Sequence, residues 1–473
     1  MLHIPILRMG TPYESLERTP LAHHETGEAM AEVSCANSGL IVRDMCRIDD
    51  TVLERFTVAE LVAKCQKAAD LFLRATLPIG DVDQSFDDYI GQLSGSTGMP
   101  VAHCRANANK IHRVLSEIDV VLRGLTRGLD LTILDQGHGA HAGGTLSYFR
   151  KGRVFGAVLP SNSPGVHGLW IPAVALKAPI VLKPGGQEPW SPYRIIQALI
   201  AAGMPREAFG FYPTDHAGAN EILRHADRSM VFGDATTTRA WQSDPRVEVH
   251  GPGFSKIILG DDCADRWEQY VDILVESIVA NGGRSCINAS GVWTPRHGPA
   301  IADALAKRLS GVAALPASDP DATVAAFANP DMAARMSEII DHDLKSAGAT
   351  DVTQTHRGAP RLASLGRCRY LLPTVIACTS PEHALANREF LFPFASVVTC
   401  PSEQMLDAIG PTLVCTAITE DKRMIAALMQ CPNIDRLNIG AIPTVRLAWD
   451  QPHEGNLFEH LYRQRAFQSE HAA

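Results

Sequence analysis

The glycine-rich turn that ends at Cys286 carries the residue of this chain best suited to covalent chemistry. It reads Asn281-Gly-Gly-Arg-Ser-Cys286 and follows a stretch of helical hydrophobic periodicity. A cysteine in such a turn is accessible, and backbone N–H groups around it favour the thiolate and lower its pKa from about 8.5. Cys286 is therefore a candidate nucleophile. The alternative role, a small buried hydrophobe, is expected for most of the other cysteines.

Polar or glycine residues follow a series of short apolar runs, where strands should end. The runs span 154–159, 180–182, 209–212 and 229–232, and helical stretches at 165–177, 191–202 and 216–225 separate them. This alternation is typical of a parallel, doubly wound α/β sheet. Asn162, Lys183 and Gly233 lie at the ends of three runs. Because ligands bind beyond the carboxyl ends of such strands, we expect a cofactor or substrate beside these residues.

A second α/β unit begins at residue 256. Its strands are predicted at 256–259, 291–294, near 370–377 and at 394–399, and its helices at 264–280, 298–310 and 328–347. Upstream of both units, helices are predicted at 51–77 and 101–129. Glu60 stands three residues after Thr57, which favours a capping box there. Residues 1–50 show no regular pattern.

The composition excludes several function classes. The 473 residues are 45% hydrophobic and 20% charged, which is ordinary for a globular protein of two or three folding units. A net charge of −9 disfavours binding to nucleic acid or to an anionic membrane. Eleven irregularly spaced cysteines without a CxxC pair indicate reduced thiols and no zinc ribbon, and the pair His138 and His141 lacks neighbouring carboxylates, so no metal site is predicted. With no signal-peptide core or apolar span, we expect a soluble cytoplasmic protein.

Five motifs, taken in order, resemble the aldehyde dehydrogenase superfamily across about 150–460. They are Pro160-Ser-Asn-Ser-Pro164, Val181-Leu-Lys-Pro184, Gly233-Asp-Ala235, Asn281-Gly-Gly-Arg-Ser-Cys286 and Arg388-Glu-Phe-Leu-Phe-Pro393. The resemblance implies an aldehyde dehydrogenase-like fold of two interleaved doubly wound α/β domains. Residues 1–255, with a returning tail at 446–473, would bind the dinucleotide, and residues 256–445 would carry the nucleophile. The active site is expected between them. A homo-oligomer, a dimer or tetramer, is also implied.

The resemblance assigns roles to the residues of these motifs. Cys286 would be the nucleophile, and the amide of Asn162 together with the Cys286 N–H would hold the oxyanion. Glu389 would bond the nicotinamide ribose and Lys183 the adenosine ribose. Ser161, Gly186 and Asp234 are grouped with the cofactor-binding residues. Gly233 opens the turn whose N–H groups would face the pyrophosphate, and Thr238 replaces the family's second glycine in that turn.

The loop after Lys183 bears on the choice of cofactor. Members that prefer NAD often carry a glutamate three residues after the lysine, where Gly186 stands here. A carboxylate would repel a 2′-phosphate and glycine does not, so NADP(H) is favoured and NAD(H) is possible. Glu188 lies two residues later and could restore the repulsion if the loop folds back.

The segment Val249-His-Gly-Pro-Gly-Phe-Ser-Lys256 departs from the pattern of hydrolytic members. His250 falls where those members carry the glutamate that activates water, with an uncertainty of one residue, and Glu248 is the nearby carboxylate. The Gly-Pro-Gly form resembles the CoA-acylating branch, in which the thiol of CoA releases the acyl group. His250 could then move the thiol proton near neutral pH, or merely pack in the turn.

These features imply an NAD(P)-dependent enzyme that interconverts an acyl-CoA and its aldehyde through a Cys286 thioester. One alternative is a hydrolytic aldehyde dehydrogenase that uses Glu248, Glu389 or His250 to activate water. The other is a non-catalytic dinucleotide-binding member. His453 and Glu454, in the segment 449–458, could reach the active site or a subunit interface, or that segment could only close over the sheet.

Overall fold

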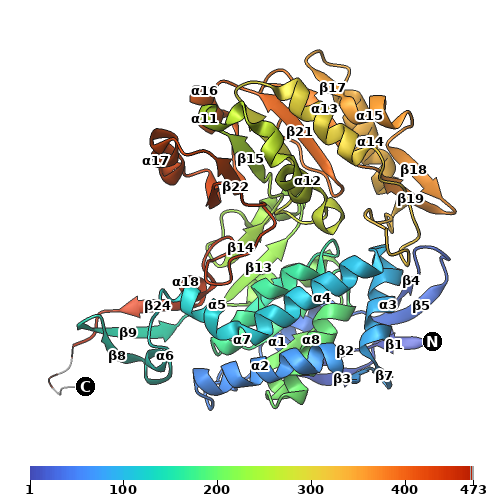
Figure 1. Ribbon diagram of the computed structural model, residues 1–473. Coiled ribbons are helices and arrows are strands. Elements are labelled where there is room, and N and C mark those ends of the chain that lie inside the picture. Colours follow the sequence, from blue (N-terminus) through green and yellow to red (C-terminus); the bar gives the residue numbers. More distant parts are fainter. Residues whose placement is uncertain (469, 471–473) are drawn as a thin grey trace.

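The fold is built on two seven-stranded sheets (Figure 1). The computed structural model describes residues 1–468 and 470. Strands β14 to β12 of the first sheet are parallel, and β2 and β3 are added antiparallel at its edge. In spatial order, the strands of this sheet are β14 (Val247–His250), β13 (Arg228–Phe232), β10 (Phe155–Val158), β11 (Ile180–Lys183), β12 (Phe209–Phe211), β2 (Ile6–Arg8) and β3 (Thr11–Tyr13).

The register of the first sheet brings the ends of its central strands to one edge. Val158 of β10 pairs with Lys183 of β11 and with Val231 of β13. Phe232 of β13 pairs in turn with His250 of β14. The loops that follow these strands therefore begin side by side. This edge is the one at which the sequence predicted ligand contacts.

In chain order the first strand of the second sheet is β15, which is separated from β14 by five residues. It is parallel except for β17, which pairs antiparallel with β20. In spatial order, its strands are β17 (Ala349–Asp351), β20 (Thr374–Cys378), β21 (Phe394–Thr399), β16 (Gly291–Thr294), β15 (Lys256–Leu259), β22 (Thr412–Ile418) and β23 (Ile434–Ile439). The mixed α/β class and its two parallel sheets agree with the fold class predicted from the sequence.

Helices pack on both sheets and bury their strands. The helices of the first half are α1 (Ser38–Met45), α2 (Val58–Arg74), α3 (Phe86–Thr97), α4 (Val101–Ser116), α5 (Ile118–Leu125), α6 (Thr132–Gln136), α7 (Ile171–Ala175), α8 (Trp190–Ala201), α9 (His216–His225) and α10 (Ala235–Thr238). Those of the second half are α11 (Asp261–Ala264), α12 (Val271–Val279), α13 (Gly298–Leu309), α14 (Pro330–Asp343), α15 (Val352–Arg357), α16 (Ser402–Ala408) and α17 (Lys422–Gln430). In β15, Ile257 and Ile258 belong to different core clusters, because successive side chains point to opposite faces of a strand. A parallel strand covered on both faces reads as a continuous apolar run.

Short sheets and the C-terminal segment complete the chain. They comprise β1 (Leu2–Ile4), β5 (Ala29–Ser34) and β4 (Arg18–Ala22); β6 (Leu77–Ile79) and β7 (Val82–Gln84); β18 (Leu362–Leu365) and β19 (Cys368–Leu371); and β24 (Tyr462–Arg465), β9 (Gly144–Arg150) and β8 (His138–His141). The chain therefore returns from the second sheet to the first half through α18 (Leu457–Leu461) and β24. The sheet of β8, β9 and β24 projects from the body (Figure 1).

Several element boundaries differ from those predicted. Residues 1–50, expected to be irregular, form β1 to β5 and α1, whose strands are too short to show a period. The predicted helix at 51–77 begins at Val58, and its capping box between Thr57 and Glu60 is confirmed. The helix predicted at 101–129 divides at Glu117 into α4 and α5. The helix predicted at 264–280 is regular only from Val271, in α12.

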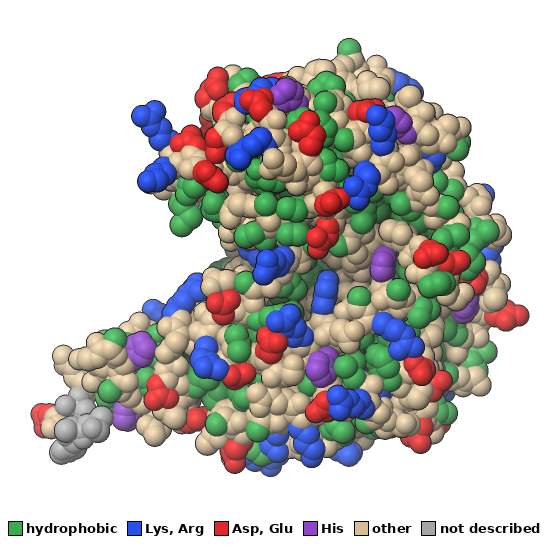
Figure 2. Space-filling view, viewed as in Figure 1, with side chains coloured by type: hydrophobic (Ala, Val, Ile, Leu, Met, Phe, Trp, Pro, Cys, Tyr) green, Lys and Arg blue, Asp and Glu red, His purple; other side chains and the backbone are tan. Residues whose placement is uncertain are grey.

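The molecule has a hollowed surface and free cysteine thiols. Figure 2 shows the molecule hollowed between its upper and lower halves. All eleven cysteines are free thiols, as their irregular spacing predicted. Within residues 1–468 and 470, no helix is long and apolar enough to cross a membrane.

Candidate active site

Two cavities meet at Cys286. The first has a volume of about 140 Å³ and the second about 470 Å³. Four residues line both cavities, namely Asn162, Val166, His250 and Cys286. Three of these four, Asn162, His250 and Cys286, are the catalytic residues predicted from the sequence. Asn162 lies in the loop after β10, His250 is the last residue of β14, and Cys286 follows α12.

The turn before Cys286 requires its glycines. Asn281, Gly282 and Gly283 all have left-handed backbone conformations, with φ of 55°, 64° and 67°. A Cβ on Gly283 would lie 2.3 Å from the backbone nitrogen of Pro393, so only glycine lets the two motifs approach this closely. The Asn281 amide donates to Ser163 Oγ at 3.1 Å, and its carbonyl oxygen accepts from Asn107 on α4 at 2.7 Å. The nucleophile loop is thus tied to the first half of the chain.

The Gly-Pro-Gly segment packs directly against the backbone of Cys286. A Cβ on Gly253 would lie 1.9 Å from the Cys286 carbonyl oxygen, which explains why a glycine is needed there. Ser255 Oγ donates to the same carbonyl oxygen at 2.7 Å. This segment therefore positions the nucleophile loop.

The expectation that Cys286 has a lowered pKa is wrong for this structure. Burial raises the pKa of the Cys286 thiol, and the negative charges of Glu454 and Glu389 raise it further. Arg436 opposes this only in part. The thiol is therefore protonated at neutral pH, and a base must remove its proton before it attacks a carbonyl.

Asn162 lies where the two cavities meet, and its side-chain amide already forms a hydrogen bond. Its Nδ2 donates to the carbonyl oxygen of Arg284 at 2.8 Å. This bond links the loop after β10 to the nucleophile turn. It also places the Asn162 amide on the wall that both cavities share with Cys286.

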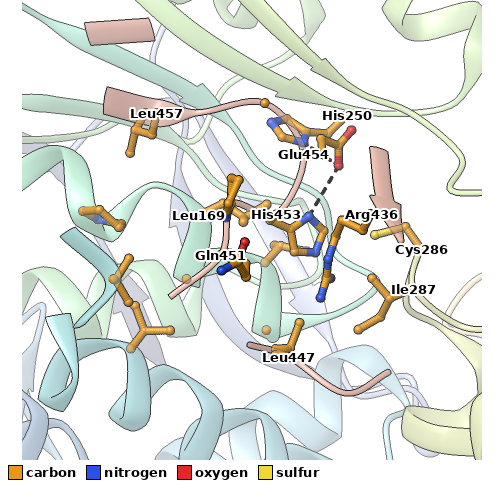
Figure 3. A pocket seen from close by; sticks show the side chains of 18 of the residues that line it. Leu169, His250, Cys286, Ile287, Arg436, Leu447, Gln451, His453, Glu454 and Leu457 are labelled. Carbon is orange, nitrogen blue, oxygen red and sulfur yellow. Dashed lines mark ion pairs between the residues drawn. The ribbon is translucent and has the colours of Figure 1, made fainter. Parts of the chain in front are cut away.

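His250 is held by an ion pair from the C-terminal segment. Its Nδ1 lies 2.9 Å from a carboxylate oxygen of Glu454, and its ring stacks on Phe232 with centroids 4.5 Å apart (Figure 3). Burial lowers the pKa of His250, but Glu454 more than offsets this, and the pKa is raised overall. Within the described part of the chain neither ring nitrogen forms a hydrogen bond, but Nδ1 is engaged in the ion pair and Nε2 has no polar partner. That nitrogen is the one available for proton transfer.

Glu454 is the charged centre of this group. A second histidine, His453, places its Nδ1 3.7 Å from the same carboxylate (Figure 3). Burial alone would raise the pKa of Glu454, but the two histidines lower it to about 2. Burial lowers the pKa of His453. Glu454 is therefore ionised at neutral pH and paired with His250.

Glu248 also lines the first cavity. Burial raises its pKa to about 7, and the neighbouring Glu454 adds to this shift. A Cβ on Gly455 would lie 2.1 Å from a Glu248 oxygen, so the carboxylate packs against the backbone of the C-terminal segment. A carboxylate with a pKa near neutrality has the properties of a general base.

Glu389 lies on the wall of the second cavity, which also includes Cys286. Its carboxylate accepts the backbone N–H of Gly253 at 3.2 Å and that of Phe254. Burial nevertheless raises its pKa to about 7. The expected contact with a ribose would use the remaining acceptor capacity of this carboxylate.

The predicted dinucleotide contacts divide into two sets. Ser161, Gly233 and Asp234 line the second cavity, whereas Lys183 and Gly186 do not. Lys183 is largely buried at the end of β11, and burial lowers its pKa. Gly186 is exposed, and a Cβ there would meet nothing within 4 Å.

The turn after Gly233 is capped by its own aspartate. The carboxylate of Asp234 accepts the N–H groups of Thr236 and Thr237 at 3.0 and 2.8 Å. The expectation that this turn offers its amides to a pyrophosphate is wrong for these two amides, because the capping carboxylate satisfies them. Thr238 is buried and donates to the Asp234 carbonyl oxygen at 2.9 Å.

Glu188 does not fold back toward the cofactor. It is 1% exposed, and its carboxylate lies 2.8 Å from His167 Nε2 and accepts the Ser191 N–H at 2.8 Å. The tight pairing of Gly185 with Glu188 turns the side chain inward. Glu188 therefore supplies no charge against a 2′-phosphate, and that alternative is wrong.

A family model described as the aldehyde dehydrogenase family matches residues 83–409. The chain belongs to this family. Among solved structures, 3,6-anhydro-L-galactose dehydrogenase in complex with NAP superimposes with a TM-score of 0.78 at 14% identity, covering 98% of this chain and 99% of that one. An NAD-dependent aldehyde dehydrogenase from Sinorhizobium meliloti gives 0.79 at 16% identity, covering 98% and 94%. At these identities the likeness shows a shared fold.

The sequence similarity to individual relatives covers a smaller part of each chain than the structural superpositions do. The non-phosphorylating aspartate-semialdehyde dehydrogenase of Halomonas elongata is 20% identical over 61% of this chain and 65% of its own. The N-succinylglutamate 5-semialdehyde dehydrogenase of Vibrio cholerae is 25% identical over 52% and 50%. The chain thus spans about half to two thirds of the relatives' length.

The aldehyde dehydrogenase match ends before several residues of the site. Arg436 of β23, His453 and Glu454 all follow residue 409 and line the first cavity. The sequence raised His453 and Glu454 as residues that could reach the active site, and the structure places both in the cavity with Cys286. The sequence did not single out Arg436 or Asn107. No local spacing links these positions to Cys286.

Proposed function

We propose that this chain is an NAD(P)-dependent aldehyde dehydrogenase that works through a thioester on Cys286. The observation that carries the proposal is the junction of two cavities at Cys286, Asn162 and His250. One cavity would hold the aldehyde and the other the nicotinamide. Residues 1–255 with 446–473 would form the dinucleotide-binding part, and 256–445 the catalytic part. A dimer or tetramer belongs to the same proposal.

The second cavity fits the nicotinamide end of a dinucleotide. Its wall carries Glu389 beside Cys286, and Gly233 and Asp234 where β13 ends. When bound, the nicotinamide supplies the acceptor or donor of hydride. Because Glu188 is buried and Gly186 is exposed without a carboxylate, we propose that NADP(H) is preferred.

The chain's own residues then act in a defined order. His250 Nε2 takes the proton of the Cys286 thiol, and the sulfur bonds to the aldehyde carbon. The Cys286 N–H and the Asn162 amide stabilise the oxygen that becomes negative, provided the amide turns from the Arg284 carbonyl or uses its second N–H. Loss of hydride leaves an acyl thioester on Cys286. In the reverse direction the same thioester is reduced to the aldehyde.

We further propose that CoA is the acyl acceptor. His250 occupies the region in which hydrolytic members carry a glutamate, and a thiol needs only modest base assistance. With Glu454 holding Nδ1, the free Nε2 is suited to take the thiol proton of CoA. The acyl group passes to CoA, and Cys286 leaves as a thiolate that is then protonated.

Hydrolysis is the second candidate, and Glu248 is the observation that favours it. This carboxylate lines the aldehyde-side cavity, and its pKa of about 7 suits the activation of water. The product would be a free carboxylic acid. The two candidates share every step up to the thioester.

The deciding experiment follows NADPH formation from NADP and a panel of aldehydes, with and without CoA, and identifies the products. Turnover that requires CoA and yields an acyl-CoA supports acyl transfer. CoA-independent release of a free acid overturns it, and Glu248→Gln should then block turnover. Dinucleotide binding by a folded protein without any turnover would indicate a non-catalytic member.

A further inference from the structure

Two cationic side chains line the first cavity without a carboxylate partner. Lys110 extends from α4 and Arg436 from β23, on opposite halves of the fold. Neither lies within ion-pair distance of an acidic residue in the described part of the chain. Arg436 donates only to the Arg446 carbonyl, at 3.4 Å, and its Nη1 is buried without a partner.

Both cations are half-buried, and Nη1 of Arg436 is buried without a partner, which makes the absence of a carboxylate partner informative. Burial lowers the pKa of both Lys110 and Arg436, which reflects the cost of desolvating a positive charge. Buried charges are normally paired, because an uncompensated one destabilises the fold. An anionic group that enters the cavity would supply the missing partner.

The acidic residues of the cavity do not neutralise this charge. Glu454 is paired with His250 and His453, and its charge offsets the desolvation of Arg436 only in part. Glu248 has a pKa of about 7 and carries only part of a charge at neutral pH. Lys110 and Arg436 therefore leave the aldehyde-side cavity with a positive excess.

The remaining wall of the cavity suits a short aliphatic chain. Its volume of about 140 Å³ is small beside the roughly 300–1,000 Å³ of sites for drug-sized ligands. Apolar side chains make up much of its lining, including Val114, Val121, Leu125, Leu169 and Leu447. Arg436 lies close to Cys286 in this wall (Figure 3), so a charge on the substrate would be only a few carbons from the aldehyde.

We propose that the substrate is a short aldehyde that carries an anionic group at its other end, bound by Arg436 with Lys110 as a second cation. This inference rests on the proposed function and adds the substrate class to it. An arginine fork can bind a carboxylate or a phosphonate through two parallel N–H bonds. Both anions share the chemistry that the cavity offers.

The test compares 4-oxobutanoate with its neutral methyl ester, with butanal and with a phosphonate of the same chain length. For the wild-type protein, kcat/KM should be at least about tenfold higher for an anionic aldehyde than for the neutral ones, as expected for hydrogen bonds to charged groups. Arg436→Gln should remove most of this advantage, so that kcat/KM falls at least about tenfold more for the anionic aldehydes than for the neutral ones. Lys110→Met should act in the same direction, and Arg423→Gln on exposed α17 serves as the matched control.

A binding assay separates this inference from the proposed activity. Succinate should slow alkylation of Cys286 by iodoacetamide, followed on the Cys286 peptide by mass spectrometry, and butyramide should not. Arg436→Gln should lose this protection. Equal kcat/KM for charged and neutral aldehydes, or equal protection by succinate and butyramide, overturns the anionic site. Protection without turnover of any aldehyde supports the site and overturns the proposed activity instead.

Discussion

The ion pair between Glu454 and His250 should control the pH dependence of the proposed aldehyde dehydrogenase activity. The two groups lie 2.9 Å apart, and Glu454 is the contact that raises the pKa of His250 against the effect of burial. An opposite charge at such distances shifts a pKa by about 1–3 units, equivalent to about 1.4–4 kcal/mol. Glu454→Gln removes that charge and keeps the size of the side chain, so the pKa of His250 should fall by about this amount.

The direction of the effect on activity follows from the proposed role of His250 as a base. The imidazole accepts a proton only when neutral, so activity of the wild-type protein rises as the pH passes upward through the raised pKa. In Glu454→Gln the same rise should occur about 1–3 units lower. Loss of the Glu454 charge also removes one cause of the raised pKa of Cys286, so alkylation of this thiol should begin at lower pH as well.

The assay is kcat/KM against pH for the wild-type protein, Glu454→Gln and His250→Gln, with alkylation of Cys286 measured in parallel. Glu459→Gln, an exposed substitution in the same segment, is the control and should leave both profiles unchanged. His250→Gln should lose the limb assigned to the imidazole. An acidic limb that stays in place in a folded Glu454→Gln protein that binds dinucleotide would refute the assignment of His250 as the base held by Glu454.

Four further outcomes test other parts of the site. Cys286→Ser should lose activity by several orders of magnitude in steady-state assays while dinucleotide binding, followed by fluorescence, is retained. Asn162→Ala should lower kcat about 10²–10³-fold, and an unchanged kcat would argue against an oxyanion role. Glu188→Leu should lower the free energy of unfolding, measured with denaturant, by about 1–3 kcal/mol, because His167 loses its buried partner. Gly186→Glu should raise the KM for NADP at least about tenfold and leave the KM for NAD nearly unchanged; equal effects on both would contradict the position assigned to this loop.

The edge of the first sheet could be predicted from local sequence because parallel strands impose its geometry. Once β10, β11, β13 and β14 are recognised, their register places the residues that follow them side by side. Asn162, Lys183 and Gly233 were found in this way, whereas His250 was found from the family resemblance of its segment. Cys286 was found from its glycine-rich turn, whose left-handed backbone explains the glycines.

The remaining errors concern properties that depend on distant contacts. The inward direction of Glu188 depends on His167, which is separated from it in the chain by α7 and β11. The raised pKa of Cys286 depends on burial and on Glu454, and neither is visible in the motif. The short strands of residues 1–50 are stabilised by pairing with other strands, as β2 is by β12, so their local sequence does not identify them.

The protonated thiol and the paired histidine together change how the nucleophile must be activated. A cysteine with a low pKa would carry a thiolate at neutral pH, whereas the half-buried Cys286 has a raised pKa and keeps its proton. His250 is the ionisable side chain that shares both cavities with it, and Glu454 holds that imidazole in place. Because Glu454 also opposes ionisation of Cys286, the carboxylate that holds His250 also lowers the fraction of Cys286 present as thiolate. An anionic substrate at Arg436 would offset the positive charge that lowers the pKa of Cys286, so we expect substrate binding to raise that pKa further and to increase the need for a base.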